Sequence, residues 1–320
     1  MNRPLTLYLI IDYFVYNLVK VVEIALNLIP ESWARSFGRF LGRLVWIVSR
    51  DRREAVIENL TIAFGKEKST DWIRKTALKS FEHVGLLVVE FFLIRRWSHK
   101  EIAERIIIQG KSDYDLAMMP GNHGICLLTS HFGCFEVSAA TTKFLGFRTN
   151  LFATGLKNPF LNRYVFSRAG KDAEIKTFPH KGVVKDLIQL LKNGELLAIL
   201  ADQRGDAERG VFVDFFGTQA PANEVFAKLT IEGKARILPI CTYRLDNGKY
   251  LSTLGPDIEF EPTGDHRADL RALSQKFHDL FETWLRINPE QGFWLQRKWR
   301  RKPASKRRKK RKDHQNLSNS

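Results

Sequence analysis

Over the second two-thirds of the chain, short apolar runs rich in β-branched and aromatic residues alternate with helical stretches. This alternation predicts an α/β fold, with a mixed, mostly parallel sheet, flanking helices and departures from parallel pairing toward the end. The predicted strands lie at 125–130, 149–154, 173–178, 195–201, 211–216, 236–244 and 250–260. The predicted helices of this part lie near 134–145, 159–170, 182–192, 223–233 and 267–286.

The first hundred residues read differently, because their apolar residues recur at helical rather than strand spacing. We therefore expect an all-α N-terminal part that is membrane-associated. Its predicted helices are Leu5–Ile29, Glu31–Ser49, Arg52–Phe64 and Thr70–Ile94. The expected organisation is a membrane anchor helix at 1–30, a helical region at 31–110, an α/β domain at 111–300 and a basic, disordered tail at 301–320.

The membrane assignment depends on the helix Leu5–Ile29, which has a broad apolar face and a narrow polar stripe. The stripe consists of Asp12, Tyr16, Lys20, Glu23 and Asn27. Such a helix can lie in the membrane interface, or span the membrane with the stripe turned to protein. The alternative is a core helix of a soluble domain. A cleavable signal peptide is disfavoured, because Asp12 interrupts the apolar run and no small-residue cleavage site follows.

The positive charge of the chain is concentrated near its end. The formal net charge is +16, and the segment 297–312 holds twelve Lys or Arg and no acid. Such a segment can bind an anionic membrane surface, bind nucleic acid or remain solvated without a partner. No zinc-finger, RNA-binding or helix-turn-helix pattern accompanies it. We therefore expect an anionic membrane surface as its partner and no nucleic acid.

A histidine stands where the first predicted strand of the α/β part ends and a helix begins. His131 follows the apolar run 125–130, and Glu136 comes five positions later. In open α/β sheets the carboxyl ends of the strands carry the reacting groups. Histidine suits a general base near neutral pH, and a carboxylate can fix its tautomer and stabilise its charged form. We predict that His131 is the base and Glu136 its partner.

Two other residues are weaker candidates for the chemistry. Cys134, three residues after His131, could act as a Cys/His nucleophile, although direct attack by an activated hydroxyl needs no thiolate. His123 could be a second base, but it has no acid at a matching spacing. The three cysteines make no disulfide or metal-site pattern, so we expect a reducing compartment and no metal.

Several motifs in order resemble the bacterial lipid A biosynthesis acyltransferases, the late lauroyl and myristoyl transferases of the H-x4-E lysophospholipid-acyltransferase-like superfamily. The resemblance covers roughly residues 52–300. The matching pieces are RREAVIENLTIAFG at 52–65, SHFGCFE at 130–136, LKNPFLNRYVFSRAG at 156–170, LLAILADQRG at 196–205, GVFVDFFGTQA at 210–220, ILPICTYRL at 237–245 and PEQGFWLQRKWR at 289–300.

The resemblance implies an O-acyltransferase at the cytoplasmic face of the bacterial inner membrane. Its donor would be a fatty acyl thioester, on acyl carrier protein or coenzyme A, and its acceptor a hydroxyl of a lipid A precursor. Besides the thioester co-substrate, no cofactor is implied. Another glycolipid or a lysolipid remains an alternative acceptor. An esterase or thioesterase would use the same groove with water, but no G-x-S-x-G elbow is present. A non-enzymatic membrane-anchoring or nucleic-acid-binding protein would not explain His131 beside the predicted acids.

Substrate-binding residues are expected in two places. Asp202 and Gln203 end the apolar run 196–201, so they should face the same crevice as His131. The resemblance matches Arg168 to a family arginine, whose forked donors suit a carboxylate or phosphate. The nearby Lys157 and Asn158 are included as substrate-binding candidates. The segment 210–217, with three phenylalanines, is a candidate wall for the acyl chain.

Overall fold

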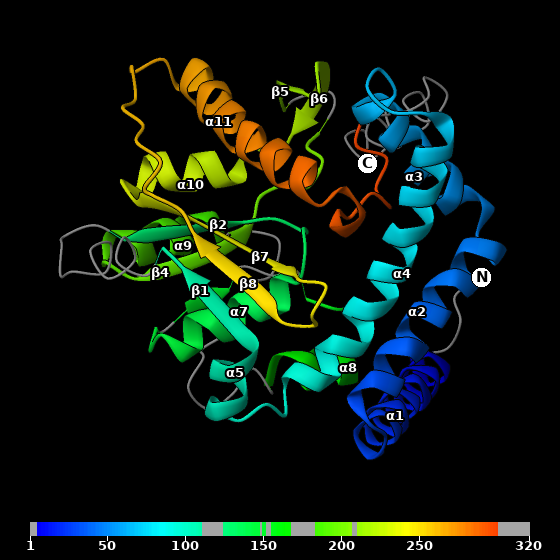
Figure 1. Ribbon diagram of the computed structural model, residues 1–320. Helices are drawn as coiled ribbons and strands as arrows, with labels where there is room; N and C mark the ends of the chain where they lie inside the picture. The colour runs from blue at the N-terminus through cyan, green and yellow to red at the C-terminus, as the bar shows by residue number, and fades with distance from the viewer. Residues whose placement is uncertain are drawn as a thin grey trace, which may run out of the picture.

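A computed structural model describes residues 5–110, 124–147, 149–151, 155–167, 183–206 and 210–299. Its central sheet carries helices on both faces, and a group of long N-terminal helices lies beside it (Figure 1). The predicted strand at 173–178 and the predicted tail at 301–320 lie outside the described residues. The mixed, mostly parallel α/β architecture and the N-terminal helical region are confirmed.

The N-terminal part is helical, as predicted. Its helices are α1 (Leu5–Leu28), α2 (Glu31–Val48), α3 (Arg50–Phe64), α4 (Thr70–Ile94) and α5 (His99–Arg105). The start of α4 is fixed by Ser69, whose hydroxyl accepts a hydrogen bond from the main-chain N–H of Trp72. The short α5 begins with a capping box between Ser98 and Glu101, a signal that the sequence analysis did not use.

Glycines let α2 and α4 approach each other closely. A Cβ atom on Gly42 would lie 2.2 Å from the carbonyl oxygen of Phe81, and one on Gly85 would lie 2.1 Å from that of Gly38. Any side chain at these positions would push the two backbones apart. The sequence therefore determines a tight helix pair, on which the rest of the N-terminal part is assembled.

The main sheet has six strands in the order β1-β8-β7-β2-β4-β3. Among the described strands of this sheet, only the β7–β8 pair is antiparallel, as expected from the consecutive strands at the end of the chain. The strands are β1 (Ile106–Gln109), β2 (Ile125–Thr129), β3 (Thr149–Leu151), β4 (Leu196–Leu200), β7 (Arg236–Arg244) and β8 (Tyr250–Leu254). β1 lies inside the stretch 31–110 that the sequence analysis assigns to the helical region, so that stretch also contributes the edge of the sheet.

Helices cover both faces of the sheet, because the central strand β2 has apolar side chains on both of its sides. Cys126 and Leu128 of β2 belong to the core formed with α9, α10 and α11, whereas Ile125 and Leu127 point to the opposite core. α7 packs on that second face, against β7 and β8. The helices of this part are α7 (Phe135–Phe144), α8 (Pro159–Ser167), α9 (Val183–Lys192), α10 (Val225–Gly233), α11 (His266–Ile287) and the 3-10 turn η1 (Pro289–Gln291).

A separate hairpin lies over α11. β5 (Val211–Phe215) pairs antiparallel with β6 (Thr218–Ala222), a strand that the sequence analysis did not predict. The two turn residues, Phe216 and Gly217, both have positive φ, as a two-residue hairpin requires. Phe216 tolerates this conformation because its N–H bonds to Glu282 and its ring packs on Phe64.

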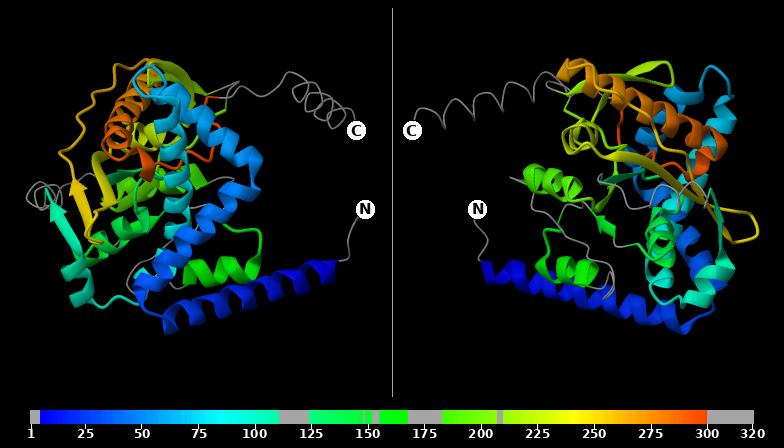
Figure 2. Two further views of the ribbon diagram at one scale, coloured as in Figure 1. Left: turned by 45° about the vertical axis from the view of Figure 1, so that its right-hand side comes forward. Right: turned by 90° about the vertical axis from the view of Figure 1, so that its left-hand side faces the viewer.

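α1 runs along one edge of the molecule beside α8 (Figure 2). Most of its polar stripe faces the protein: Glu23 is buried, Asp12, Tyr16 and Lys20 are half-buried, and Asn27 is exposed. Its large apolar side chains point outward, among them Phe14 at 68%, Leu18 at 53% and Val21 at 61% exposure. Among the described helices, none has both the length and the apolar character of a membrane-crossing segment.

Candidate active site

The loop between β2 and α7 carries His131 and is fixed to the strands around it. Gly133 has φ of 57°, and a Cβ there would lie 2.0 Å from the carbonyl oxygen of Thr242. The N–H of Gly133 donates to Gln291 O, and the N–H of Cys134 donates to Thr242 O. The loop is therefore held between β7 and η1, and His131 has a defined position at the end of β2.

His131 meets Asp202 because β2 and β4 are parallel neighbours, with Thr129 opposite Leu200. Both residues leave the sheet at the same edge, as the sequence analysis predicted. The distance between His131 Nδ1 and Asp202 Oδ1 is 2.8 Å, and the two side chains are 19% and 25% exposed. The pair is thus sheltered but accessible.

The hydrogen bond to Asp202 determines which nitrogen can act as a base. A carboxylate only accepts, so Nδ1 carries the proton and Nε2 is left with its lone pair. Burial would lower the pKa of the imidazole, but the Asp202 and Glu136 carboxylates together outweigh burial and raise the pKa above its ordinary value. For Asp202, burial alone would raise the pKa. The positive charge and hydrogen bond of His131, with the charge of Lys298, outweigh burial, so the pKa of Asp202 lies below its ordinary value.

Glu136 lies in the first turn of α7 and interacts with the same imidazole through charge. Burial raises the pKa of this carboxyl, and the nearby positive charges of Arg95 and His131 lower it less than burial raises it. Within the described structure, no hydrogen bond joins Glu136 to His131; the hydrogen bond of the imidazole goes to Asp202. The predicted partner is therefore a second, more distant carboxylate.

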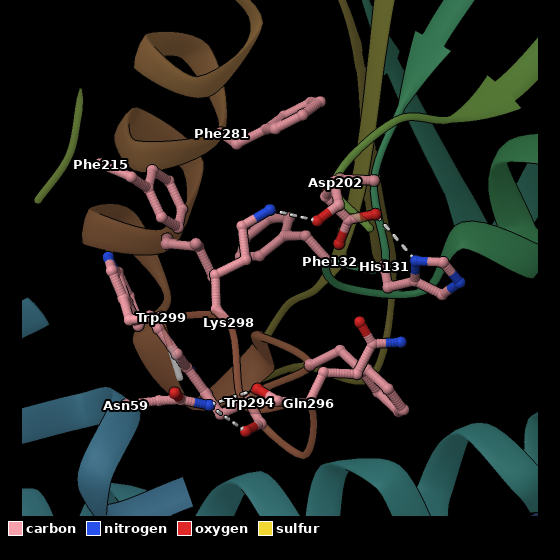
Figure 3. A pocket seen from close by; sticks show the side chains of 13 residues that line it. Asn59, His131, Phe132, Asp202, Phe215, Phe281, Trp294, Gln296, Lys298 and Trp299 are labelled. Carbon is pink, nitrogen blue, oxygen red and sulfur yellow. Dashed lines mark hydrogen bonds and ion pairs between the residues drawn. The ribbon is translucent and has the colours of Figure 1, made fainter. Parts of the chain in front are cut away.

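A buried lysine that the sequence analysis assigned to the basic segment completes the site. Lys298 is only 8% exposed, and its Nζ donates to the carbonyl oxygen of Asp202 at 2.6 Å. Figure 3 shows its side chain pointing to Asp202 from the side opposite His131. Arg297, also counted in that segment, is paired with Asp51. The positive segment thus begins within the folded body. Trp294, just before the basic segment, and Trp299, within it, are the sequence signal that could have indicated a buried start of this segment.

A largely aromatic pocket opens beside this pair (Figure 3). Its lining includes Phe215, one of the three phenylalanines of the candidate wall at 210–217, whereas Phe212 and Phe216 are not among the lining residues. Asn59 of α3 closes the pocket on one side, where its amide donates to the carbonyl oxygens of Trp294 and Gln296. The lining residues are Asn59, Ser130, His131, Phe132, Asp202, Phe215, Phe281, Leu285, Phe293, Trp294, Gln296, Lys298 and Trp299.

The other predicted binding residues lie elsewhere. Lys157 and Gln203 are exposed and do not line the pocket. Asn158 caps α8, accepting from the N–H of Leu161 and donating to the carbonyl oxygen of Asp12 in α1. Arg168 lies outside the described residues. The structure therefore brings Asp202 to His131 and gives Asn158 a structural role.

The alternative nucleophile is poorly suited to that role. Cys134 is fully buried, and burial with the nearby Glu90 carboxylate raises the pKa of its thiol well above the ordinary value. Its Sγ donates to Glu90 Oε2 at 3.4 Å. The alternative base His123 lies outside the described residues. In the ranges the structure covers, no three His, Cys, Asp or Glu side chains gather where they could hold a metal ion.

Comparison with known proteins agrees with the resemblance seen in the motifs. The family model described as bacterial lipid A biosynthesis acyltransferase matches residues 2–301. The lipid A biosynthesis lauroyltransferase of Escherichia coli K12 is 24% identical over 278 residues, which cover 86% of this chain and 88% of the relative. The lipid A biosynthesis myristoyltransferase of the same organism is 25% identical over 285 residues, with 86% and 83% covered.

A third relative, the lipid A biosynthesis acyltransferase of Haemophilus influenzae, is 21% identical over 260 residues, with 80% of this chain and 79% of the relative covered. The family match therefore includes both the helical part and the α/β part, and it includes the strand ends that carry His131 and Asp202. The chain belongs to the bacterial lipid A biosynthesis acyltransferase family and is an O-acyltransferase.

Proposed function

We propose that the protein transfers a fatty acyl chain from an acyl thioester, carried by acyl carrier protein, to a hydroxyl of a lipid A precursor. The observation that carries this proposal is the His131–Asp202 pair at the mouth of an aromatic pocket, in a chain of this family. The pair supplies a base, and the pocket supplies an apolar environment. The thioester is the only co-substrate, and no metal or redox cofactor takes part.

In the proposed reaction, Nε2 of His131 takes the proton from the acceptor hydroxyl as its oxygen attacks the thioester carbonyl. The tetrahedral intermediate then breaks its C–S bond. The imidazolium returns the proton to the leaving sulfur, so that an ester and a free thiol result. The Asp202 carboxylate stabilises the imidazolium between these two steps, because it is bonded to Nδ1 throughout.

The second carboxylate and the main chain have supporting roles in this proposal. Glu136 adds negative potential at the imidazolium, which favours proton uptake by His131. Main-chain N–H groups at the start of α7 would stabilise the oxyanion. The N–H groups of Gly133 and Cys134 already bond to Gln291 and Thr242, so the donors would come from later positions of that first turn.

The pocket is suited to the acyl chain because most of its lining is apolar. Phe215 of β5 and Phe281 of α11 face it together with the C-terminal segment that carries Trp294 and Trp299. Burying a methylene group in such surroundings contributes about 0.8 kcal/mol. An acyl chain of several carbons therefore gains enough free energy there to hold its carbonyl beside His131.

The lipid acceptor suggests a membrane surface, and α1 supports that location. Its apolar side chains face outward while most of its polar stripe faces the protein, which is the reverse of a helix on a water-soluble surface. Apolar exposure continues on α2, where Trp33 and Val48 are 69% and 70% exposed. We place this surface against anionic lipid at the cytoplasmic face of the bacterial inner membrane, where acyl carrier protein is available.

The function is tested by incubating the purified protein with acyl carrier protein thioester and a lipid A precursor, and by measuring the acylated lipid by mass spectrometry. The His131→Ala variant should lose on the order of 10²–10⁴-fold in rate, which is the usual contribution of general acid–base catalysis. His266→Ala, at an exposed position outside the pocket, is the matched control. Equal rates for the His131 variant and the parent at matched folding would refute the mechanism.

Further arms of the same assay separate the alternatives. Replacing the carrier protein by coenzyme A tests the donor. Offering another glycolipid or a lysophospholipid tests the acceptor. Release of free fatty acid without any acylated lipid would instead indicate a thioesterase, which uses the same base to activate water.

A further inference from the structure

Lys298 is a buried cation that the proposed reaction leaves without a task. It follows η1 in the C-terminal segment and lies among apolar residues, with Nζ 5.5 Å from the centre of the Phe215 ring. Burying an ammonium group is costly unless it is paired and hydrogen-bonded. A lysine in this position therefore requires an explanation.

The hydrogen bonds of Lys298 connect α11 to the segment after β4 that carries Asp202. His278 of α11 is 1% exposed, and its Nδ1 donates to the carbonyl oxygen of Ser274 at 2.8 Å. That bond leaves His278 Nε2 as an acceptor, and Lys298 Nζ donates to it at 3.1 Å. In a second hydrogen bond, Lys298 Nζ donates to the carbonyl oxygen of Asp202 at 2.6 Å. Lys298 thus fixes the main chain that carries the partner of His131.

Charges of both signs act on His131 and on Lys298. Lys298 is faced by the Asp202 carboxylate, by Arg204 and by His278; His131 is faced by Asp202, Glu136 and Lys298. Burial lowers the pKa of Lys298 to about 8, so the ammonium form predominates at neutral pH. Its positive charge disfavours the imidazolium, whereas the two carboxylates favour it.

We propose that Lys298 is a positioning residue for the His131–Asp202 pair: it holds the Asp202 main chain and keeps the imidazole available as a neutral base. The proposal rests on the assignment of His131 as the base. Two carboxylates beside one histidine favour its protonated form, in which it cannot accept a proton. A cation on the far side of Asp202 opposes part of this effect without touching the imidazole.

Three substitutions at Lys298 separate charge from geometry. Lys298→Met removes the charge and both hydrogen bonds, Lys298→Gln keeps an amide donor without charge, and Lys298→Arg keeps the charge. Lys228→Met is the control, because that lysine lies on α10 with its side chain 41% exposed and pairs with Glu232. The measurements are the pH profile of kcat/KM for acyl transfer and the titration of His131 by NMR, with its resonance assigned from a His131→Gln spectrum.

Losing the neighbouring positive charge raises the pKa of His131, so the acidic limb of the profile moves to higher pH in the Met and Gln variants. Lys298→Met should also lose on the order of 100-fold in kcat/KM, since misplacing a reacting group by about 1 Å has that effect. The loss should be larger at pH 6 than at pH 8. Lys298→Arg should keep the parent limb, and Lys228→Met should match the parent throughout.

A lower rate with an unmoved acidic limb and an unmoved His131 titration in both the Met and Gln variants would overturn the proposal. The NMR titration needs no turnover, so it distinguishes this failure from failure of the proposed function. If His131→Ala kept full activity, the base assignment would fall. The shift of the His131 titration would then still show whether Lys298 opposes the imidazolium. Thermal melts identify any variant that does not fold, and the Gln variant then replaces the Met variant.

Discussion

Replacing Glu90 by alanine should destabilise the protein by about 3–5 kcal/mol, because this carboxylate is the centre of a buried polar network. Glu90 lies on α4 and is fully buried. Arg244 of β7 donates to both of its oxygens, and the hydroxyl of Tyr250 in β8 donates to Oε1 at 2.6 Å. Arg35 of α2 lies 3.5 Å from the same oxygen. The network joins two helices to two strands.

The size of the loss follows from what remains after the substitution. The Arg244 side chain is only 9% exposed, so its guanidinium would be left buried without its counter-ion. Removing one partner of a buried ion pair costs about 3–5 kcal/mol, and an unsatisfied buried hydroxyl such as that of Tyr250 costs about 1–3 kcal/mol, part of which water entry offsets. Glu90→Gln keeps an acceptor but loses the charge, and should cost about 2–3 kcal/mol.

The pH dependence of this contribution has a definite sign. Burial would raise the pKa of Glu90, but Arg244, Tyr250 and Arg35 together outweigh burial and lower the pKa below the ordinary value of 4.5. A carboxyl whose pKa is lower in the folded state stabilises the fold fully above pH 4.5, and this stabilisation is lost as pH falls further. The difference in stability between the parent and Glu90→Gln should therefore narrow below pH 4.5.

Urea unfolding followed by circular dichroism measures these losses. Asp71→Asn is the control on the same helix, because Asp71 and its partner Lys75 are 73% and 74% exposed, and such surface pairs contribute about 0–1 kcal/mol. The double variant Glu90→Leu with Arg244→Met removes both charges and should be more stable than Glu90→Leu alone. A cost of less than about 1 kcal/mol for Glu90→Ala would refute this account.

Two further predictions concern the site and the membrane surface. Asp202→Asn should reduce acyl transfer at least about tenfold more than Glu136→Gln, since of the two carboxylates only Asp202 is hydrogen-bonded to His131. It should also move the acidic limb of the kcat/KM–pH profile to lower pH, opposite to Lys298→Met. Equal losses of activity in the two variants would contradict this. Three glutamines on α1 should weaken vesicle binding in high salt by roughly 1000-fold or more, at about 1.5–3 kcal/mol for each buried apolar side chain. They replace Phe14, Leu18 and Val21. Ile287→Gln, exposed elsewhere, is the control, and undiminished sedimentation of the triple variant would place the membrane contact elsewhere.

Elements with a strong local pattern were predictable from the sequence, and short ones were not. The helix Thr70–Ile94 and the strand Arg236–Arg244 have the predicted bounds, because each is a long segment with a clear periodicity. β1 has only four residues, Ile106–Gln109, and its short apolar run does not distinguish a strand from a helix by periodicity. The hairpin strand β6 contains a proline, Pro221, which demotes a run of residues as a strand candidate.

The site was predictable as far as strand ends determine it. His131 and Asp202 were each placed at the end of a strand, and the parallel β2–β4 register brings them together. The choice of Asp202 over Glu136 as the hydrogen-bonding partner was not predictable, because it depends on how two strands 71 positions apart in sequence align. The burial of Lys298 was not predictable, because it belongs to a basic segment whose composition indicates exposure to solvent.

The helical part and the sheet form one folded unit, because buried contacts connect them at the loop that carries His131. Glu90 of α4 accepts from Arg244 of β7 and from the thiol of Cys134 in that loop. Asn59 of α3 holds the C-terminal segment that carries Lys298, through the carbonyl oxygens of its neighbours. A helix that brings the protein to lipid, as we propose for α1, is therefore packed in the same folded unit as the helices that position His131. An anchor of this kind fixes the orientation of the pocket relative to the lipid surface as well as the distance between them.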